Sequence, residues 1–291
     1  MDGVVVASVF TLPHNSDDTV ALRHHANPLT SKSTPAVIFP GGGAGVGAEI
    51  ARSFVRSGSK AVIILGRRES VLSAAKKELD ALGSSKILTY AADVVDEAGL
   101  NSAFTATEEA VGKVDIVVAC AGFMPEVVLA AIAEIGDWCD LAGKAFEVNV
   151  RGLLLTFRAW MPHKSNGTPS FIYVNAGLSG YSPSKIAAAS LIGHLQAENP
   201  DLHITNFHPG ILETPMATKS QFAVSRGDIS LPAGFAVWLA SPAAAWTGGK
   251  FLWAHWDVDE LIAMKDEIAL GNELVMTLNG WPKQVDVVVK A

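Results

Sequence analysis

Apolar residues in this chain gather in short runs, and between these runs they recur every three or four positions. Short apolar runs are typical of strands buried on both faces, and the wider spacing is typical of helices that cover a sheet. We therefore expect strands at residues 36–39, 61–65, 86–91, 114–119, 171–174 and 203–207. Between them we expect helices at residues 48–55, 71–82, 98–111, 138–161 and 182–197.

A glycine-rich turn follows the first expected strand, in Gly41-Gly-Gly-Ala-Gly-Val-Gly47. Glycines at such a turn let the backbone approach a pyrophosphate that a side chain would hold away. The amides and the positive dipole at the start of the next helix then stabilise that anion. Strand, glycine turn and helix together predict the first unit of a dinucleotide-binding fold.

The regular alternation of strands and helices predicts an α/β fold. We expect a single Rossmann-type domain over residues 36–291, in which a seventh strand comes from the C-terminal segment. Its doubly wound, mostly parallel seven-stranded sheet would carry helices on both faces. Residues 1–35 are expected to be an N-terminal extension packed on this domain.

Composition excludes several classes of protein. The 291 residues are 49% apolar and 18% charged, which is typical of a globular chain. A net charge of −7 without a basic stripe argues against nucleic-acid binding. Two cysteines are too few for a disulfide framework or a zinc site, and no apolar run approaches the roughly 18 residues of a membrane span. We expect a cytoplasmic protein without metal or membrane.

Further motifs follow the glycine turn in a fixed order. They are Asp93-Val94, Ala119-Cys-Ala-Gly122, Phe146-Glu-Val-Asn149, Tyr181-Ser-Pro-Ser-Lys185 and His208-Pro-Gly210. With them the chain resembles the short-chain dehydrogenase/reductases over about residues 36–257, and its tail resembles a subgroup frequent in fungal metabolism. The resemblance implies an oxidoreductase that acts on a small molecule with a nicotinamide cofactor, as a homodimer or homotetramer.

The resemblance also implies a set of cofactor-binding residues. They are Gly41, Gly45, Val46, Gly47 and Thr214 at the pyrophosphate, Asp93 and Val94 at the adenine, Ala121 and Gly122 where the cofactor passes closely, and Pro209, Gly210 and Ile211 toward the nicotinamide. Three positions depart from the family pattern, because Pro40 replaces a threonine and Ala119 and Cys120 replace two asparagines. Cys120 reads as a small packed residue rather than a nucleophile.

The second expected strand ends in Gly66-Arg67-Arg68. An acidic residue there would bind the adenosine ribose hydroxyls and favour NAD. A guanidinium instead can hold a 2′-phosphate with two parallel hydrogen bonds. We therefore expect NADP(H), with Arg67 as the main contact and Arg68 as the second. The alternative is that both arginines are solvated surface residues.

Tyr181 and Lys185 are four residues apart, so a helix would place them on one face. An ammonium close to a phenol favours the phenolate and makes the phenol a usable acid near neutral pH. The resemblance implies that Tyr181 is the proton donor and that Lys185 also holds the nicotinamide ribose. It further implies that Asn149 completes a water relay to the lysine.

The family's catalytic serine has no clear counterpart. Ala176 and Gly177 stand at the expected positions, and Ser179 is the only nearby hydroxyl. Ser179 is our candidate substitute, with a turn residue as the alternative. Loss of an oxyanion donor slows a ketone reduction by about 100- to 1000-fold. A positively charged iminium substrate develops no oxyanion and would tolerate the loss better.

The wall of the substrate site is expected from Phe123, Met124, residues 175–180, Met216 and Phe222. These residues predict a bulky apolar substrate, or else they only pack the core. Our leading hypothesis is an NADPH-dependent reductase of a carbonyl or an imine in secondary metabolism. The alternatives are a non-redox enzyme on the same scaffold, such as a cyclase, isomerase or cycloaddition catalyst, and a nucleotide-binding protein without turnover.

Overall fold

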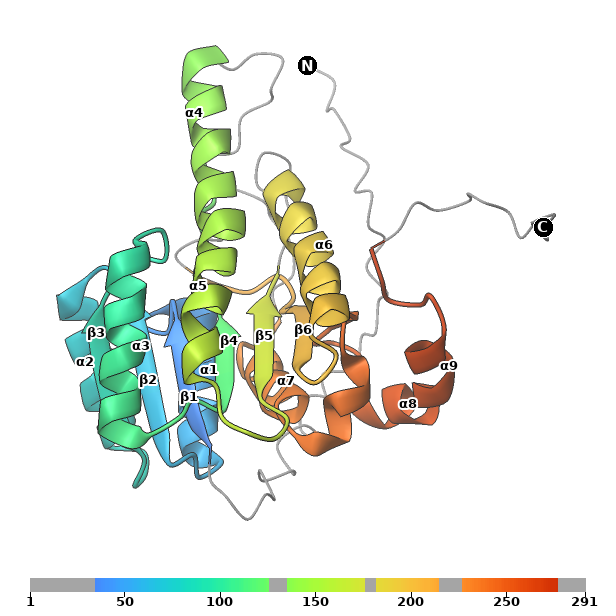
Figure 1. Cartoon of the computed structure of the whole chain (residues 1–291), viewed down its shortest axis with the longest axis horizontal. Coiled ribbons are helices and arrows are strands. Elements are labelled where there is room, and N and C mark those ends of the chain that lie inside the picture. Colours follow the sequence, from blue (N-terminus) through green and yellow to red (C-terminus); the bar gives the residue numbers. More distant parts are fainter. Residues whose placement is uncertain (1–34, 126–134, 176–181, 215–226, 277–291) are drawn as a thin grey trace.

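A parallel sheet of seven strands forms the centre of the molecule (Figure 1). The computed structural model describes residues 35–125, 135–175, 182–214 and 227–276. The strand order is β3-β2-β1-β4-β5-β6-β7. Successive strands are added toward one edge from β1 to β3 and toward the other edge from β4 onward, so the order of connection reverses between β1 and β4. The strands are β1 Ala36–Pro40, β2 Ala61–Gly66, β3 Lys86–Ala91, β4 Ile116–Ala119, β5 Ser170–Val174, β6 His203–His208 and β7 Phe251–Trp253. Ligands of such sheets bind at the carboxyl ends of the strands near this reversal.

Helices cover both faces of the sheet (Figure 1). Val37 and Phe39 of β1 pack with α1, α2 and α7, whereas Ala36 and Ile38 pack with α3, α5 and α6. The helices are α1 Gly45–Arg56, α2 Glu69–Asp80, α3 Glu97–Val111, α4 Ile135–Phe146, α5 Gly152–Trp160, α6 Ser182–Glu198, α7 Ser230–Leu239, α8 Val258–Ala263 and α9 Lys265–Leu270. The apolar runs of the sequence are therefore strands buried on both sides, and the predicted fold class is confirmed.

The helix expected over residues 138–161 is interrupted. A π-helical segment, Glu147–Arg151, separates α4 from α5, and the Gly152 N–H bonds back to the Glu147 carbonyl. The hydrophobic spacing of the sequence continues through this segment, so it gave no sign of the extra residue in the turn. Such bulges are frequent at functional sites, and this one holds Asn149.

Two smaller differences concern the edges of elements. α1 begins at Gly45 instead of residue 48, and β4 begins at Ile116 instead of residue 114. Val114 pairs with Lys164 in an isolated bridge before the strand starts. Residues 1–34 lie outside the described part, so the division into an extension and a domain stays a prediction. Within the described ranges, each helix is too short or too polar to cross a membrane.

Candidate active site

The glycine turn between β1 and α1 brings three backbone segments into close contact. Gly41 has a φ of +88°, and a Cβ there would lie 2.5 Å from the Ala121 nitrogen. A Cβ on Gly47 would lie 2.5 Å from the Gly41 carbonyl oxygen. The Cys120 N–H also donates to the Pro40 carbonyl at 2.9 Å, so backbone holds this corner without the family's asparagine side chain.

The start of α1 is suited to an anion. Ala44 precedes the helix in an extended conformation and offers no side-chain cap, and the first turn contains no acidic residue. The first amides of a helix lack partners within it and carry the positive end of its dipole. Thr214 lies opposite, because a Cβ on Gly45 would come 3.8 Å from the Thr214 Cγ2 atom. Gly45, at the start of α1, and the Thr214 side chain therefore lie side by side.

The segment after β6 is fixed by two histidines. The Gly210 N–H donates to His208 Nδ1 at 3.0 Å, and Gly210 has a φ of +92°. A Cβ on Gly210 would lie 2.0 Å from His255 Cε1, so only glycine fits under this ring. The imidazole of His208 stacks on Trp253 with centroids 4.2 Å apart. These contacts set the backbone of Pro209, Gly210 and Ile211 at the carboxyl end of the sheet.

The adenosine end predicted by the sequence lies where β2 and β3 end. Arg67 and Asp93 come together there, with an Nη1–Oδ2 distance of 3.8 Å. The Arg67 side chain is 66% exposed, so its guanidinium can reach a ligand. Arg68 is also exposed and immediately precedes α2. Val94 is buried against Gly152, where a Cβ would lie 2.8 Å from the Val94 Cγ2 atom.

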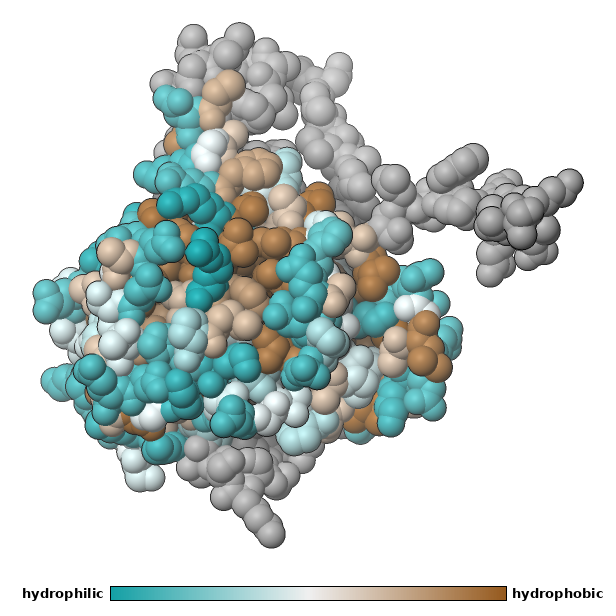
Figure 2. Space-filling view, viewed as in Figure 1, coloured by the Kyte–Doolittle hydropathy of each residue, from teal (hydrophilic) through white to brown (hydrophobic). Residues whose placement is uncertain are grey.

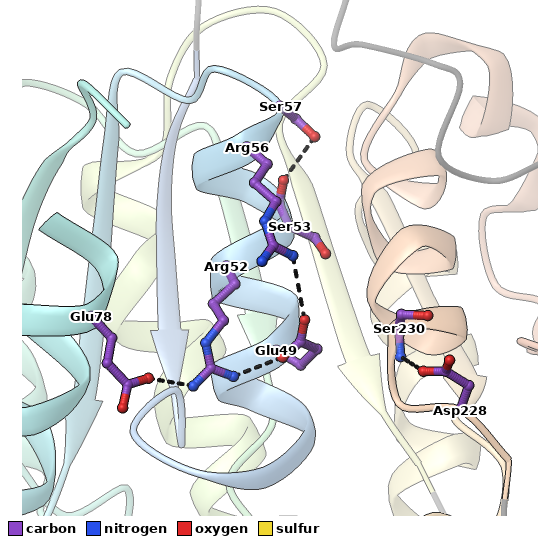
Figure 3. A network of polar contacts seen from close by, with 8 residues as sticks. All are labelled: Glu49, Arg52, Ser53, Arg56, Ser57, Glu78, Asp228 and Ser230. Atoms are coloured by element: carbon purple, nitrogen blue, oxygen red, sulfur yellow. Dashed lines mark hydrogen bonds and ion pairs between the residues drawn. The ribbon is translucent and has the colours of Figure 1, made fainter. Parts of the chain in front are cut away.

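A hollow of about 490 Å³ lies between α1 and α2 beside the glycine turn. Figure 3 shows its ionic wall, in which Arg52 lies between Glu49 and Glu78. Arg52 Nη1 is 2.7 Å from a Glu49 carboxylate oxygen. The charges of this wall are paired with one another, and Lys185 does not line the hollow. We therefore place the candidate chemistry outside this hollow, beside Lys185.

Lys185 lies in the first turn of α6 and is only 4% exposed. Its Nζ donates to the Tyr173 hydroxyl oxygen at 2.7 Å and to the Val174 main-chain carbonyl at 3.2 Å. The Tyr173 hydroxyl in turn donates to the main-chain carbonyl of Asn149 at 3.3 Å. The structure thus brings the predicted pair Asn149 and Lys185 together, with Tyr173 between them.

The side chain of Asn149 is fully buried and ties two other segments together. Its Oδ1 accepts the Phe123 N–H at 2.8 Å, and its Nδ2 donates to the Phe123 carbonyl at 3.0 Å. Nδ2 also lies 2.9 Å from Ser184 Oγ on α6. Asn149 therefore fixes the segment after β4 against the helix that carries Lys185.

Burial controls the charges around Lys185. It lowers the pKa of the Lys185 ammonium from its ordinary 10.5 to about 7, and the nearby Cys120 opposes this shift. Burial likewise raises the pKa of the Cys120 thiol to about 12, against the smaller effect of Lys185. Cys120 is therefore a protonated thiol at neutral pH, as expected of a packing residue rather than a nucleophile.

A buried amide network connects β5, β6 and α6. Asn175 Nδ2 donates to the Lys185 main-chain carbonyl at 3.1 Å and to Asn206 Oδ1 at 3.3 Å. Our sequence reasoning missed Tyr173 and placed Asn175 only in the substrate wall. Their signal was present in the sequence, because Tyr173 carries a hydroxyl inside a largely apolar strand and Asn175 directly follows that strand.

Several predicted site residues lie outside the described part of the chain. They are Tyr181, Ser179, Ala176, Gly177, Met216 and Phe222. Of the predicted wall, Met124 is buried at 6% exposure, and the ring of Phe123 lies 5.0 Å from the Lys144 ammonium. In the described ranges, no three histidine, cysteine or acidic side chains are grouped as metal ligands.

This fold and this site define a nucleotide-binding α/β protein of the dehydrogenase type, and comparison with known proteins gives the family. The chain belongs to the short chain dehydrogenase family, whose model matches residues 35–223. The short chain dehydrogenase/reductase AacuD of Aspergillus aculeatus is 34% identical over 259 residues, which cover 84% of this chain and 87% of that protein. A short chain dehydrogenase/reductase of Claviceps purpurea is 31% identical, over 87% of this chain and 88% of that protein. The family resemblance inferred from the motifs is confirmed.

Solved structures share the fold. A short-chain type dehydrogenase/reductase from Mycobacterium ulcerans superposes with a TM-score of 0.69 at 22% identity, covering 77% of this chain and 89% of that one. L-Sorbose reductase from Gluconobacter frateurii, solved with NADPH and L-sorbose, has a TM-score of 0.66 at 20% identity, covering 76% and 95%. By its family the chain is an oxidoreductase of the short-chain type.

The described residues fit a nicotinamide dinucleotide by a steric test. A Cβ at Gly41 or Gly47 would meet backbone within 2.5 Å, so the turn has to be this tight to bring its amides together. The uncapped start of α1, without an acidic side chain, leaves those amides to an anion. The glycine turn and the start of α1 therefore suit the diphosphate of such a cofactor.

Proposed function

We propose that this protein is an NADPH-dependent reductase of a carbonyl or imine group in a bulky, apolar substrate of the secondary-metabolite kind. One observation carries the proposal: Lys185 is buried beside Asn149 at the carboxyl ends of β4 and β5, four residues after Tyr181. Membership of the family supports the oxidoreductase class. The fungal relatives agree with a biosynthetic role, and none of those named here favours the non-redox alternative.

In this proposal the cofactor lies along the carboxyl ends of the strands. Amides at Gly41, Gly45, Val46 and Gly47, with Thr214, hold the diphosphate, and Asp93 and Val94 border the adenine. Ala121 and Gly122 admit the cofactor because they are small, and the backbone of Pro209, Gly210 and Ile211 holds the nicotinamide amide. The geometry in support is the close packing of Gly41 on Ala121 and of Gly45 beside Thr214, together with the hydrogen bond that fixes Gly210.

The choice of NADPH over NADH rests on Arg67 and Arg68. Both side chains are exposed where β2 ends. Gly66 stands at the position where an acidic residue would bind the ribose hydroxyls. Asp93 lies close enough to Arg67 to orient its guanidinium, and a 2′-phosphate would compete for it. Binding experiments with both nucleotides test this preference.

The bound cofactor supplies the hydride. Tyr181 donates a proton to the carbonyl oxygen that is reduced, or to the nitrogen of a neutral imine, whereas a substrate that is already an iminium takes up the hydride without a proton. Lys185 holds the ribose and favours ionisation of the phenol. Asn149 holds the segment after β4 against α6, the helix that carries Lys185. With Ala176 at the position of the serine, an iminium suits the site better than a ketone, because it needs no oxyanion donor; Ser179 is the candidate replacement for a ketone.

The experiment follows nicotinamide absorbance with matched cyclic imines and cyclic ketones of the same bulk. We expect NADPH oxidation, and we expect imines to exceed ketones by about 100-fold or more in kcat/KM. Conversion of substrate without cofactor would replace this proposal with the non-redox alternative. Nucleotide binding without turnover on the panel would favour the alternative of a nucleotide-binding protein without turnover.

The cofactor preference has its own test, in which calorimetry compares NADPH with NADH. Arg67→Ala should weaken NADPH binding about 10- to 100-fold and change NADH binding little, because one charged hydrogen-bonding partner is removed. Arg158→Ala is the matched control, since Arg158 is an exposed arginine on α5 away from this end. Equal loss of NADPH and NADH binding would assign Arg67 a general rather than a phosphate-specific role.

We also propose a homodimer or homotetramer. Apolar side chains gather on the surface between α5 and α6 (Figure 2), and Phe146, Leu154 and Ile186 are large apolar residues exposed by 37–42%. Contiguous exposed apolar surface of this kind marks an interface. Leu154→Asp should dissociate the oligomer in light scattering, and an unchanged mass would contradict this surface.

A further inference from the structure

Tyr173 places a phenol inside the site that the proposed chemistry does not use. It belongs to β5, it is 1% exposed, and its ring packs with the helices on the α5 and α6 side of the sheet. Buried tyrosines generally satisfy their hydroxyl with a partner. Here the hydroxyl lies between two groups of the site, the Lys185 ammonium at 2.7 Å and the Asn149 carbonyl at 3.3 Å.

The Asn149 carbonyl, which accepts the hydrogen bond from the Tyr173 hydroxyl, is held in place by its surroundings. Asn149 sits in the π-helical segment between α4 and α5, where the hydrogen-bonding pattern of the helix changes. Its side chain is bonded to the main chain of Phe123 and to Ser184. The segment therefore cannot turn away without breaking buried hydrogen bonds, and such breaks are unfavourable.

The ammonium on the other side needs the phenol. A cation as deeply buried as Lys185 is stable only where partners replace its water. Tyr173 contributes twice, through its hydroxyl oxygen and through its ring face, whose centroid is 4.5 Å from Nζ. The Val174 carbonyl adds another acceptor at 3.2 Å, while Cys120 and His208 also face Lys185 as titratable groups.

We infer that Tyr173 is a positioning residue whose hydroxyl joins the Asn149 carbonyl directly to the Lys185 ammonium. In the family pattern given above, a water molecule links the asparagine to the lysine. Here the described contacts make that link with a side chain anchored on β5. The position of Lys185 then depends on the strand rather than on an exchangeable water. The effect on turnover rests on the proposed reductase function, whereas the link itself does not.

The first test compares Tyr173→Phe with Tyr90→Phe. Phenylalanine keeps the ring and its packing and removes only the hydroxyl, and Tyr90 is a half-buried tyrosine on β3 that serves as the matched control. We expect kcat to fall about 10- to 100-fold with little change in KM for NADPH, since a hydrogen bond to a charged group is lost. Tyr90→Phe should leave both unchanged.

The second readout needs no cofactor or turnover. The rate at which an amine-directed reagent modifies Lys185, followed by mass spectrometry of its peptide against pH, reports the ionisation of the ammonium. In Tyr173→Phe the midpoint should move down by about one pH unit, because one acceptor of the ammonium is gone. The same midpoint in wild type, Tyr173→Phe and Tyr90→Phe would overturn the inference, even if the protein proves to be a reductase.

A reciprocal variant decides the matter if Tyr173→Phe does not fold. The chain contains three tyrosines, so a Tyr181→Phe background leaves Tyr90 and Tyr173 as the titrating phenols. Adding Lys185→Met should shift one of the two phenolate transitions in the ultraviolet spectrum. If both transitions stay in place, the link is absent. A wild-type protein that never oxidises NADPH would refute the proposed function, and these two titrations would still judge the link.

Discussion

The two halves of the candidate site are built from different groups, one from main chain and the other from side chains. Around the glycine turn the site consists of backbone, with Gly41 and Gly47 packed against neighbouring main chain and the start of α1 left uncapped. Around α6 it consists of buried side chains, with Lys185, Tyr173 and Asn149 in one hydrogen-bonded chain. A site made of backbone tolerates a change in the chemistry of its side chains but not an increase in their volume. A site made of side chains depends on each functional group.

The largest expected effect tests the side-chain half. With a ketone or a neutral imine as substrate, Tyr181→Phe should lower kcat for NADPH oxidation by about 100- to 10,000-fold, because it removes the positioned acid. KM for NADPH should change little, since the nucleotide is held mainly by the other half. Steady-state kinetics beside Tyr90→Phe measure this. Undiminished turnover would remove Tyr181 from the mechanism.

A buried histidine at the amino end of β6, opposite the carboxyl ends that form the candidate site, gives the fold a pH dependence. His203 Nε2 lies 2.9 Å from Thr247 Oγ1, whose own hydroxyl donates to the Ala244 carbonyl, so the imidazole Nε2–H is the donor in the contact with Thr247. Burial lowers the pKa of His203 to about 4. The unfolded chain binds a proton near pH 6.5 and the folded chain does not, so stability is unaffected above that pH and falls as the pH drops toward 4.

The size of this loss is about 3 kcal/mol for His203, from a pKa difference between about 6.5 and about 4. Urea unfolding at a series of pH values measures it, and His203→Gln should flatten the slope. His194→Gln is the control, because His194 is exposed on α6. A slope that His203→Gln leaves unchanged would assign the acid sensitivity to other groups, among them His208, whose pKa burial also lowers to about 4.

The backbone half should respond to volume. Gly47→Ala places a Cβ 2.5 Å from the Gly41 carbonyl oxygen, and we expect about 1–3 kcal/mol lower unfolding free energy with much weaker NADPH binding. Gly143→Ala is its control, because a Cβ there meets nothing within 4 Å and alanine favours the helix. Unfolding and calorimetry measure both variants. Normal nucleotide binding by Gly47→Ala would show that the turn does not need its tight contact.

The smallest effect concerns the support of α6. Asn175→Ala removes the donor to the Lys185 carbonyl and should lower the unfolding free energy by about 1–2 kcal/mol. We expect a several-fold drop in kcat as Lys185 loses its fixed position. Asn101→Ala, at an exposed position of α3, should stay within about 0.5 kcal/mol of wild type. If both asparagine variants behave alike, Asn175 does not position the helix.

The sequence was informative wherever the physics is local. Apolar runs indicated the strands because strands buried on both faces need uninterrupted apolar residues, and glycines indicated the turn because only they fit its backbone. The spacing of Tyr181 and Lys185 required only the period of a helix. The roles assigned to these residues stay predictions until they are measured.

The contacts that join distant segments were decided by the tertiary structure alone. Tyr173 meets Asn149 and Lys185 because β5 lies beside β4 and under α6, across separations of 24 and 12 residues. His255 covers Gly210 from a segment beyond β7, and the π-helical turn redirects Asn149 without a change in hydrophobic spacing. Local patterns record which face of an element is buried, but they carry no information about which polar group another element brings to that face. For that reason the sequence determined the fold and the residue types of the site, and only packing determined how the lysine is held.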